Sequence, residues 1–201
     1  MKRNHVAFPL RIITPSSMPG EVRAILKPGE IIQDHQGRIR QRPTHYFRVE
    51  NEAQARKTRI APYFRVHEFI DVDVYETASL RVWPRYMPCA VAILAAHLSA
   101  LRATLGEGIY ISANGGFRSP QHRKSTPDSI HAWGTAANIY RIGDEYLSKP
   151  EQVRKWRQRM RRLLPTASFR PIPCGGDSVV DHLHIDIGYV THVPFPEGAS
   201  K

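Results

Sequence analysis

Two short segments of the sequence gather histidine, carboxylate and amide side chains between glycines. Residues 129–138 include His131, and residues 181–186 include His184. Imidazole nitrogens and carboxylate oxygens are the ligands of catalytic zinc, which commonly takes two histidines and one carboxylate and leaves a position open for water. A group that accepts a proton from that water must lie close by. We therefore expect the two segments to form one site on neighbouring strands.

The individual residues suit different roles in such a site. His131 and His184 are the expected imidazole ligands, and Asp181, three residues before His184, is a candidate proton acceptor. Position 138, where a third and anionic ligand is expected, carries asparagine. Arg118 follows a glycine turn at the end of an expected strand, where a fixed cation can hold an anionic or oxyanionic group of a substrate.

Taken together, three motifs over residues 63–190 resemble those of the zinc peptidoglycan peptidases. This family includes D-Ala-D-Ala carboxypeptidases and dipeptidases and L-Ala-D-Glu endopeptidases, and it shares its fold with the hedgehog signalling domain. Each motif alone is a weak signal, whereas the ordered combination is fairly specific. In chain order the motifs are Gly116-Phe117-Arg118-Ser119-Pro120, Ser129-x-His131-x-x-Gly134-x-Ala136-x-Asn138 and Asp181-x-x-His184-x-Asp186.

The resemblance implies a role for each matching position. His131 and His184 would bind zinc, and Arg118 would hold the substrate and stabilise the developing oxyanion. Asp181 matches the acidic general base. Ser129 and Asp186 match recurrent positions that would orient the ligands. Ser119 and His182 are further candidates for orienting these groups or contacting the substrate, although the resemblance assigns no role to His182.

Asn138 is the departure from the family, whose pattern has aspartate there as the third zinc ligand. An amide oxygen is neutral and a poorer zinc ligand than a carboxylate. Weakened zinc binding, a different third ligand such as His182, and loss of the metal are all compatible with the sequence. Two functions therefore stay open: a zinc metallopeptidase that cleaves the peptidoglycan stem peptide, as a carboxypeptidase or an endopeptidase, and a non-catalytic module of the same fold.

The pattern of elements predicts an α+β fold with a mainly antiparallel sheet and helices on one side. Residues 63–201 are expected to form the peptidase-like domain, preceded by a β-rich extension over residues 1–62. Turn signals in the extension, including those around residues 22–26, favour short strands over helices, apart from a helical turn at 50–57.

Within residues 63–201, two helices and several strands are expected. One helix follows from the apolar periodicity of residues 88–105, with Pro88 in its first turn and Gly106 beyond its end. A second is expected between a capping box of Ser148 and Glu151 and the stop at Pro165. Strands are expected at residues 108–113, 136–142 and 179–187.

The formal net charge of +11 over 201 residues indicates an anionic partner, such as nucleic acid, an anionic membrane or an anionic wall polymer. Six basic residues crowd residues 154–162, but no nucleic-acid-binding motif surrounds them, so a solvated helix face is expected there. The expected partners are peptidoglycan or its muropeptides and anionic wall polymers, whereas nucleic acid is not expected. No apolar run approaches the roughly 20 residues that cross a bilayer.

The first residues lack the apolar run and cleavage site of a signal peptide. The sequence therefore predicts a cytoplasmic protein or one that reaches the cell wall by lysis or a dedicated route. Cys89 and Cys174 are expected to be buried thiols, with one disulfide as the alternative if the protein works outside the cell.

Overall fold

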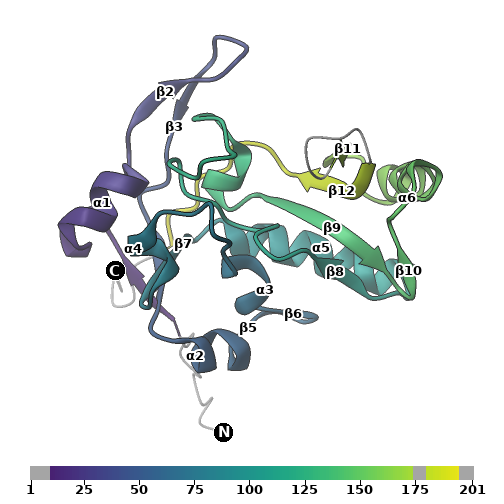
Figure 1. Cartoon of the computed structure of the whole chain (residues 1–201), viewed down its shortest axis with the longest axis horizontal. Coiled ribbons are helices and arrows are strands. Elements are labelled where there is room, and N and C mark those ends of the chain that lie inside the picture. The colour runs from purple at the N-terminus through teal and green to yellow at the C-terminus, as the bar shows by residue number, and fades with distance from the viewer. Residues whose placement is uncertain (1–9, 174–179, 195–201) are drawn as a thin grey trace, which may run out of the picture.

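A five-stranded antiparallel sheet is the centre of the part of the chain that carries the motifs (Figure 1). The computed structural model describes residues 10–173 and 180–194. Strand order in the sheet is β10-β9-β12-β11, and β8 also pairs with β9. The strands are β8 (Ile109–Ile111), β9 (Ala136–Ile142), β10 (Glu145–Tyr146), β11 (Ser168–Pro173) and β12 (Val180–Asp186).

A three-stranded sheet of order β1-β4-β7 joins the N-terminal part of the chain to the rest. It consists of β1 (Arg11–Ile13), β4 (Tyr46–Val49) and β7 (Arg85–Pro88). Two antiparallel pairs complete the strands: β2 (Ile31–Gln33) with β3 (Ile39–Gln41), and β5 (Arg59–Ala61) with β6 (Phe64–Arg65). The expectation of an α+β chain with mainly antiparallel sheets is confirmed.

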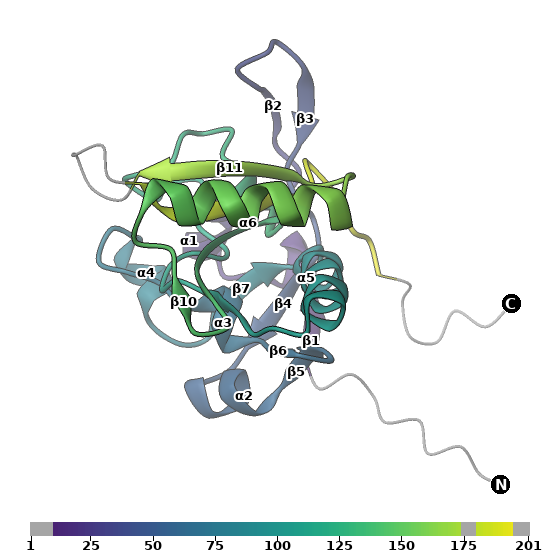
Figure 2. The same ribbon diagram turned by 90° about the vertical axis from the view of Figure 1, so that its right-hand side faces the viewer.

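Two long helices, α5 (Val91–Leu105) and α6 (Pro150–Leu163), cover one face of the five-stranded sheet. Figure 2 shows α6 lying along β11 and β12. Because these helices occupy one face, the opposite face is left for polar side chains. The shorter helices are α1 (Gly20–Leu26), α2 (Glu52–Lys57), α3 (His67–Ile70) and α4 (Ala78–Arg81), with single 3₁₀ turns η1 (Pro15–Ser17) and η2 (Ile130–Trp133).

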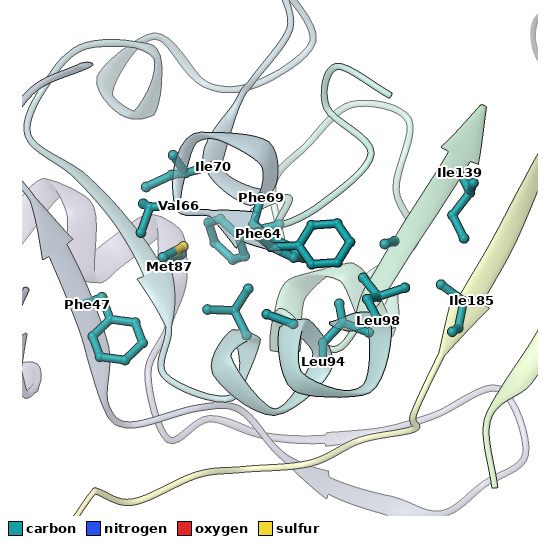
Figure 3. Close-up of a cluster of buried hydrophobic side chains, with 14 of the residues drawn as sticks. Phe47, Phe64, Val66, Phe69, Ile70, Met87, Leu94, Leu98, Ile139 and Ile185 are labelled. Atoms are coloured by element: carbon teal, nitrogen blue, oxygen red, sulfur yellow. The ribbon is translucent and has the colours of Figure 1, made fainter. Parts of the chain in front are cut away.

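One hydrophobic core runs from the N-terminal elements to the five-stranded sheet, and part of it lies between α5 and that sheet (Figure 3). Leu94 and Leu98 of α5 face Ile139 of β9 and Ile185 of β12, and all four side chains are fully buried. Burial of one such side chain contributes about 1.5–3 kcal/mol to folding. Because successive side chains in a strand point to opposite faces, the packing of Ile139 and Ile185 toward α5 turns their neighbours Asn138 and His184 to the opposite face.

Three local expectations are wrong. Residues 22–26 lie in helix α1 and not in a strand, because Val22, Ile25 and Leu26 form one buried helical face. Pro88 ends β7, where it pairs with Tyr46, so α5 begins only at Val91.

The capping box of α6 also differs from the expected one. The helix begins one residue later than expected, and Gln152 rather than Glu151 closes its start by accepting a hydrogen bond from the Lys149 amide at 2.9 Å. The other expected strands and helices are confirmed, with ends shifted by a few residues.

The N-terminal extension is built into the same core. Strand β4 pairs with β7 as well as with β1, so strands from both sides of residue 62 share one sheet. The β2–β3 hairpin also contacts η2, since the Trp133 indole donates a hydrogen bond to the Gln41 carbonyl at 2.9 Å. The domain boundary itself stays a prediction.

None of the described helices is both long and apolar enough to span a membrane. Cys89 is a buried free thiol whose pKa is raised to about 12 by burial. Cys174 lies outside the described residues.

Candidate functional site

Three neighbouring strands bring the central site residues into one row. Asn138 of β9 lies directly opposite His184 of β12, and His184 lies directly opposite Arg170 of β11. Because paired residues of adjacent strands point to the same face, the three side chains meet on the face that α5 and α6 leave uncovered. The two strand residues expected in one site, Asn138 and His184, therefore lie side by side.

The other histidine, His131, reaches this row from the 3₁₀ turn η2. Its Nδ1 donates to the carbonyl of Gly116 at 2.7 Å, which fixes the tautomer and leaves Nε2 as the unprotonated nitrogen. Gly116 has no room for a side chain, because a Cβ there would lie 2.5 Å from the Phe69 carbonyl oxygen. The rings of His131 and His184 cross edge to face with their centroids 5.1 Å apart.

Both nitrogens of His184 are in contact with polar groups. Nε2 lies 3.1 Å from Oδ2 of Asp186 and 3.0 Å from the guanidinium of Arg170, and Nδ1 lies 3.0 Å from Oδ1 of Asn138. Arg170 also pairs with Asp186 at 3.2 Å. The guanidinium of Arg170 can only donate, so its hydrogen bond to Nε2 requires the tautomer with the proton on Nδ1, which then donates to the amide oxygen of Asn138. In the other tautomer Nε2 donates to the Asp186 carboxylate, and Nδ1 and the amide oxygen are two acceptors that face each other.

Burial keeps the two histidines neutral near pH 7. Burial, together with the charge of Arg118, holds the pKa of His131 well below its ordinary value of 6.5. Burial and the charge of Arg170 also lower the pKa of His184, against the opposing effect of Asp186. Burial alone would raise the pKa of Asp186, but its hydrogen bond with His184 and the charge of Arg170 outweigh that effect and lower it.

These residues fit a zinc ion chemically. Neutral imidazoles are the form that ligates metals. Nδ1 of His131 donates to an acceptor, and Nε2 of His184 lies within hydrogen-bond distance of the Asp186 carboxylate, which can accept from it in one tautomer, the pattern that orients metal-bound histidines. The 3.0 Å separation of His184 Nδ1 and Asn138 Oδ1 is close to the distance of about 3.3 Å between two ligands of one tetrahedral zinc. Among the described residues no group of three His, Cys, Asp or Glu forms a metal-ligand set, so the site depends on the neutral oxygen of Asn138.

Arg118 borders the same site. Its Nε donates to the carbonyl of Asn114 at 2.8 Å, and its backbone amide donates to the carbonyl of His131 at 3.4 Å. Asn114 is in turn fixed by a hydrogen bond to Asp73 at 2.7 Å. The guanidinium is thus held at the mouth of the site by a buried polar network.

His131, His184, Arg118 and Arg170 line one cleft of about 470 Å³, which we call the basic cleft. Lys124 adds a third cation, and Asp128 is the one carboxylate among the described lining residues. Burial raises the pKa of Asp128, but hydrogen bonds from Thr126 and His35 lower it to about 2, so Asp128 is ionised. The surplus of cations makes this cleft suited to an anionic group.

The two predicted serines have different surroundings. Ser119 is fully buried, and its hydroxyl and amide donate to the Glu76 carboxylate at 2.7 Å and 2.9 Å. It therefore anchors the loop after Arg118 and does not face the cleft. Ser129 lines the basic cleft, and its carbonyl accepts the Ala132 amide at the start of η2.

Asp181 and His182 lie on the same face but outside the basic cleft. Ile172 pairs with His182 and Pro173 with Val180, so Asp181 is an extra residue in a β-bulge of β12. The Asp181 carboxylate lies 2.6 Å from Nδ1 of His182. Both residues line a second cleft of about 400 Å³, with Tyr140, Tyr146, Ser112 and Leu147, which we call the tyrosine cleft.

The sequence interpretation missed two groups of site residues. Arg170 contacts both His184 and Asp186 but lies in a segment with two prolines, which argue against a strand. His35, from the β2–β3 hairpin, lies in the basic cleft with its Nδ1 2.8 Å from Asp128, 93 positions away along the chain. No local pattern in the sequence connects such distant residues.

Comparison of the chain with protein-family models, with curated proteins and with solved structures found no significant match.

Proposed function

We propose that this chain is a zinc-dependent metallopeptidase that hydrolyses a peptide bond in the peptidoglycan stem peptide, on a fold like that of the hedgehog domain and the D-Ala-D-Ala peptidases. The observation that supports it is the meeting of His131, His184 and Asn138, with Gly116 and Asp186 holding the far nitrogens of the two imidazoles. The order of the three sequence motifs supports the substrate class.

In this proposal Nε2 of His131, Oδ1 of Asn138 and Nδ1 of His184 would hold the metal, which when bound would supply Lewis-acid chemistry to the scissile carbonyl and to the attacking water. Arg118 and Arg170, which both line the basic cleft, bind the anionic part of the substrate and stabilise the negative charge that develops on the carbonyl oxygen. Asp181 accepts the proton of the attacking water at its carboxylate and returns it to the leaving amine.

The test is metal analysis together with hydrolysis of purified peptidoglycan, followed by mass spectrometry of the released fragments. Replacing His184 with alanine should remove both bound zinc and hydrolysis. The matched control is His192→Ala, because His192 is exposed and is not among the residues that line the basic cleft. Full hydrolysis by the His184 variant would show that the assignment is wrong.

A second candidate function is a non-catalytic module that binds an anionic wall polymer. It is favoured by the neutral side chain at Asn138, which contacts His184 directly, and by the surplus of cations in the basic cleft. Stoichiometric zinc in the purified protein, with turnover lost on chelation and restored by zinc, would decide for the peptidase. Peptidoglycan binding without zinc or turnover would decide for the module.

A further inference from the structure

The two clefts lie next to each other on one face of the sheet. Asn138 and His184 form one cross-strand pair, and Tyr140 and His182 lie two positions further along the same strands. Residues two apart in a strand share a face and are separated by about 7 Å. Since His184 lines the basic cleft while Tyr140 and His182 line the tyrosine cleft, the Asn138–His184 pair stands where the clefts adjoin.

The charges of the two clefts are opposite. Arg118, Lys124 and Arg170 line the basic cleft, whereas Asp181 is the only residue with a fixed charge among the described lining residues of the tyrosine cleft. One oxygen of Asp181 contacts His182, and its other oxygen has no hydrogen-bond partner among the described residues. The Asp181 side chain is one third exposed, so a ligand in this cleft can reach it.

We propose that the two clefts form one substrate groove of opposite polarity that crosses the Asn138–His184 pair. The basic cleft binds a carboxylate-bearing part of a peptide, and the tyrosine cleft binds a part that carries an ammonium group and no carboxylate. Tyr140 and Tyr146 supply aromatic surface for the aliphatic stem of such a cationic residue, with the ammonium group directed to Asp181.

The opposite charges of the two clefts indicate which side of the scissile bond lies in which cleft, an inference that rests on the proposed function. Asp181 returns a proton to the leaving amine in that proposal, so the amine side of the bond occupies the tyrosine cleft. A residue with a free carboxylate next to the bond would place that anion beside Asp181, with no lysine or arginine among the described lining residues of the cleft to offset the repulsion. The bond cut is therefore internal, as in an endopeptidase, and not the one before a terminal residue.

The charge pairing can be tested by binding alone, with two peptides that differ in one side chain: acetyl-Ala-Lys-amide and acetyl-Ala-Glu-amide. Asp181→Asn should weaken binding of the lysine peptide about three- to ten-fold, as for a partly exposed ion pair, and leave the glutamate peptide unchanged. Arg170→Gln should weaken binding of the glutamate peptide and leave binding of the lysine peptide unchanged. Asp181→Glu, which keeps the charge, should restore most of the lysine-peptide affinity.

Calorimetric titration of the full chain gives these dissociation constants with and without a chelator. Unchanged lysine-peptide affinity in Asp181→Asn, or equal losses of both peptides in either variant, would overturn the proposal. The protein could bind both peptides in the expected way and yet neither hold zinc nor hydrolyse peptidoglycan. That result would support the groove and show that the proposed peptidase function is wrong. In an active enzyme, release of a single terminal amino acid would overturn the internal cut.

Discussion

Asn138→Asp is the substitution that most directly tests the metal site. It replaces a neutral oxygen 3.0 Å from His184 Nδ1 with a carboxylate of nearly the same shape. Changes to groups that merely orient metal ligands alter affinity about 10- to 100-fold, and a charged ligand in direct contact should exceed that range. We therefore expect zinc to bind at least about a hundred-fold more tightly, which corresponds to about 3 kcal/mol.

Competition with a chromophoric chelator at pH 7.5 measures this change. The control is Asn51→Asp, which adds the same charge at the exposed start of α2, where aspartate caps a helix as well as asparagine does. Only the variant at position 138 should gain affinity, and hydrolysis should rise with zinc occupancy. An unchanged zinc affinity in Asn138→Asp, or an equal gain in Asn51→Asp, would refute the placement of the metal between the histidines.

Three further predictions concern the stability of the fold around the site. The pKa of buried His131 lies well below 6.5, so as the pH falls below 6.5 the unfolded chain binds a proton at this histidine and the folded chain does not. The free energy of unfolding should therefore fall by about 1.4 kcal/mol per pH unit below that value. Urea titrations at pH 7 and pH 5 measure this fall, which should be smaller in His131→Gln. Ser119→Ala removes a hydroxyl that donates to buried Glu76 and should cost about 1–3 kcal/mol in the same titration at pH 7, and a cost near zero would contradict the anchoring role. Leu98→Ala opens a cavity under the sheet and should cost about 2–5 kcal/mol, whereas Val74, which is 70% exposed, should tolerate alanine.

The sequence motifs predict that Asn138 and His184 belong to one site, but not that they lie opposite each other. Burial of Ile139 and Ile185 leaves one choice of face for Asn138 and His184. Their facing positions depend on the register in which β9 pairs with β12, and no local feature of either segment specifies that register.

Other parts of the fold could not be predicted because their local signals are ambiguous. The short apolar run of α1 suits a strand as well as a helix, and only burial of its three apolar residues decides for the helix. Arg170 was missed because its strand contains prolines. That strand, β11, forms an edge of the sheet, where a residue without a backbone N–H is tolerated.

The role of the N-terminal extension was also underestimated. It was expected only to extend the core, yet His35 of the β2–β3 turn lines the basic cleft. The Gln41 carbonyl of β3 also accepts a hydrogen bond from Trp133 of η2. Such contacts depend on how distant segments pack, and nothing in the local sequence of the hairpin specifies them.

The bulge in β12 explains how a motif with an odd spacing can work within a strand. Asp181 and His184 are three residues apart, and in a regular strand they would point to opposite faces. The single extra residue turns Asp181 toward the face of His182 and His184, so the helices on the other face do not have to bury a carboxylate. Removing one residue between Asp181 and His184 would leave an interval of two, so a regular strand without the bulge would place both side chains on one face. An odd interval between two chemically active residues within a predicted strand can thus be used, in other sequences, as a sign that the strand is bulged at its functional end.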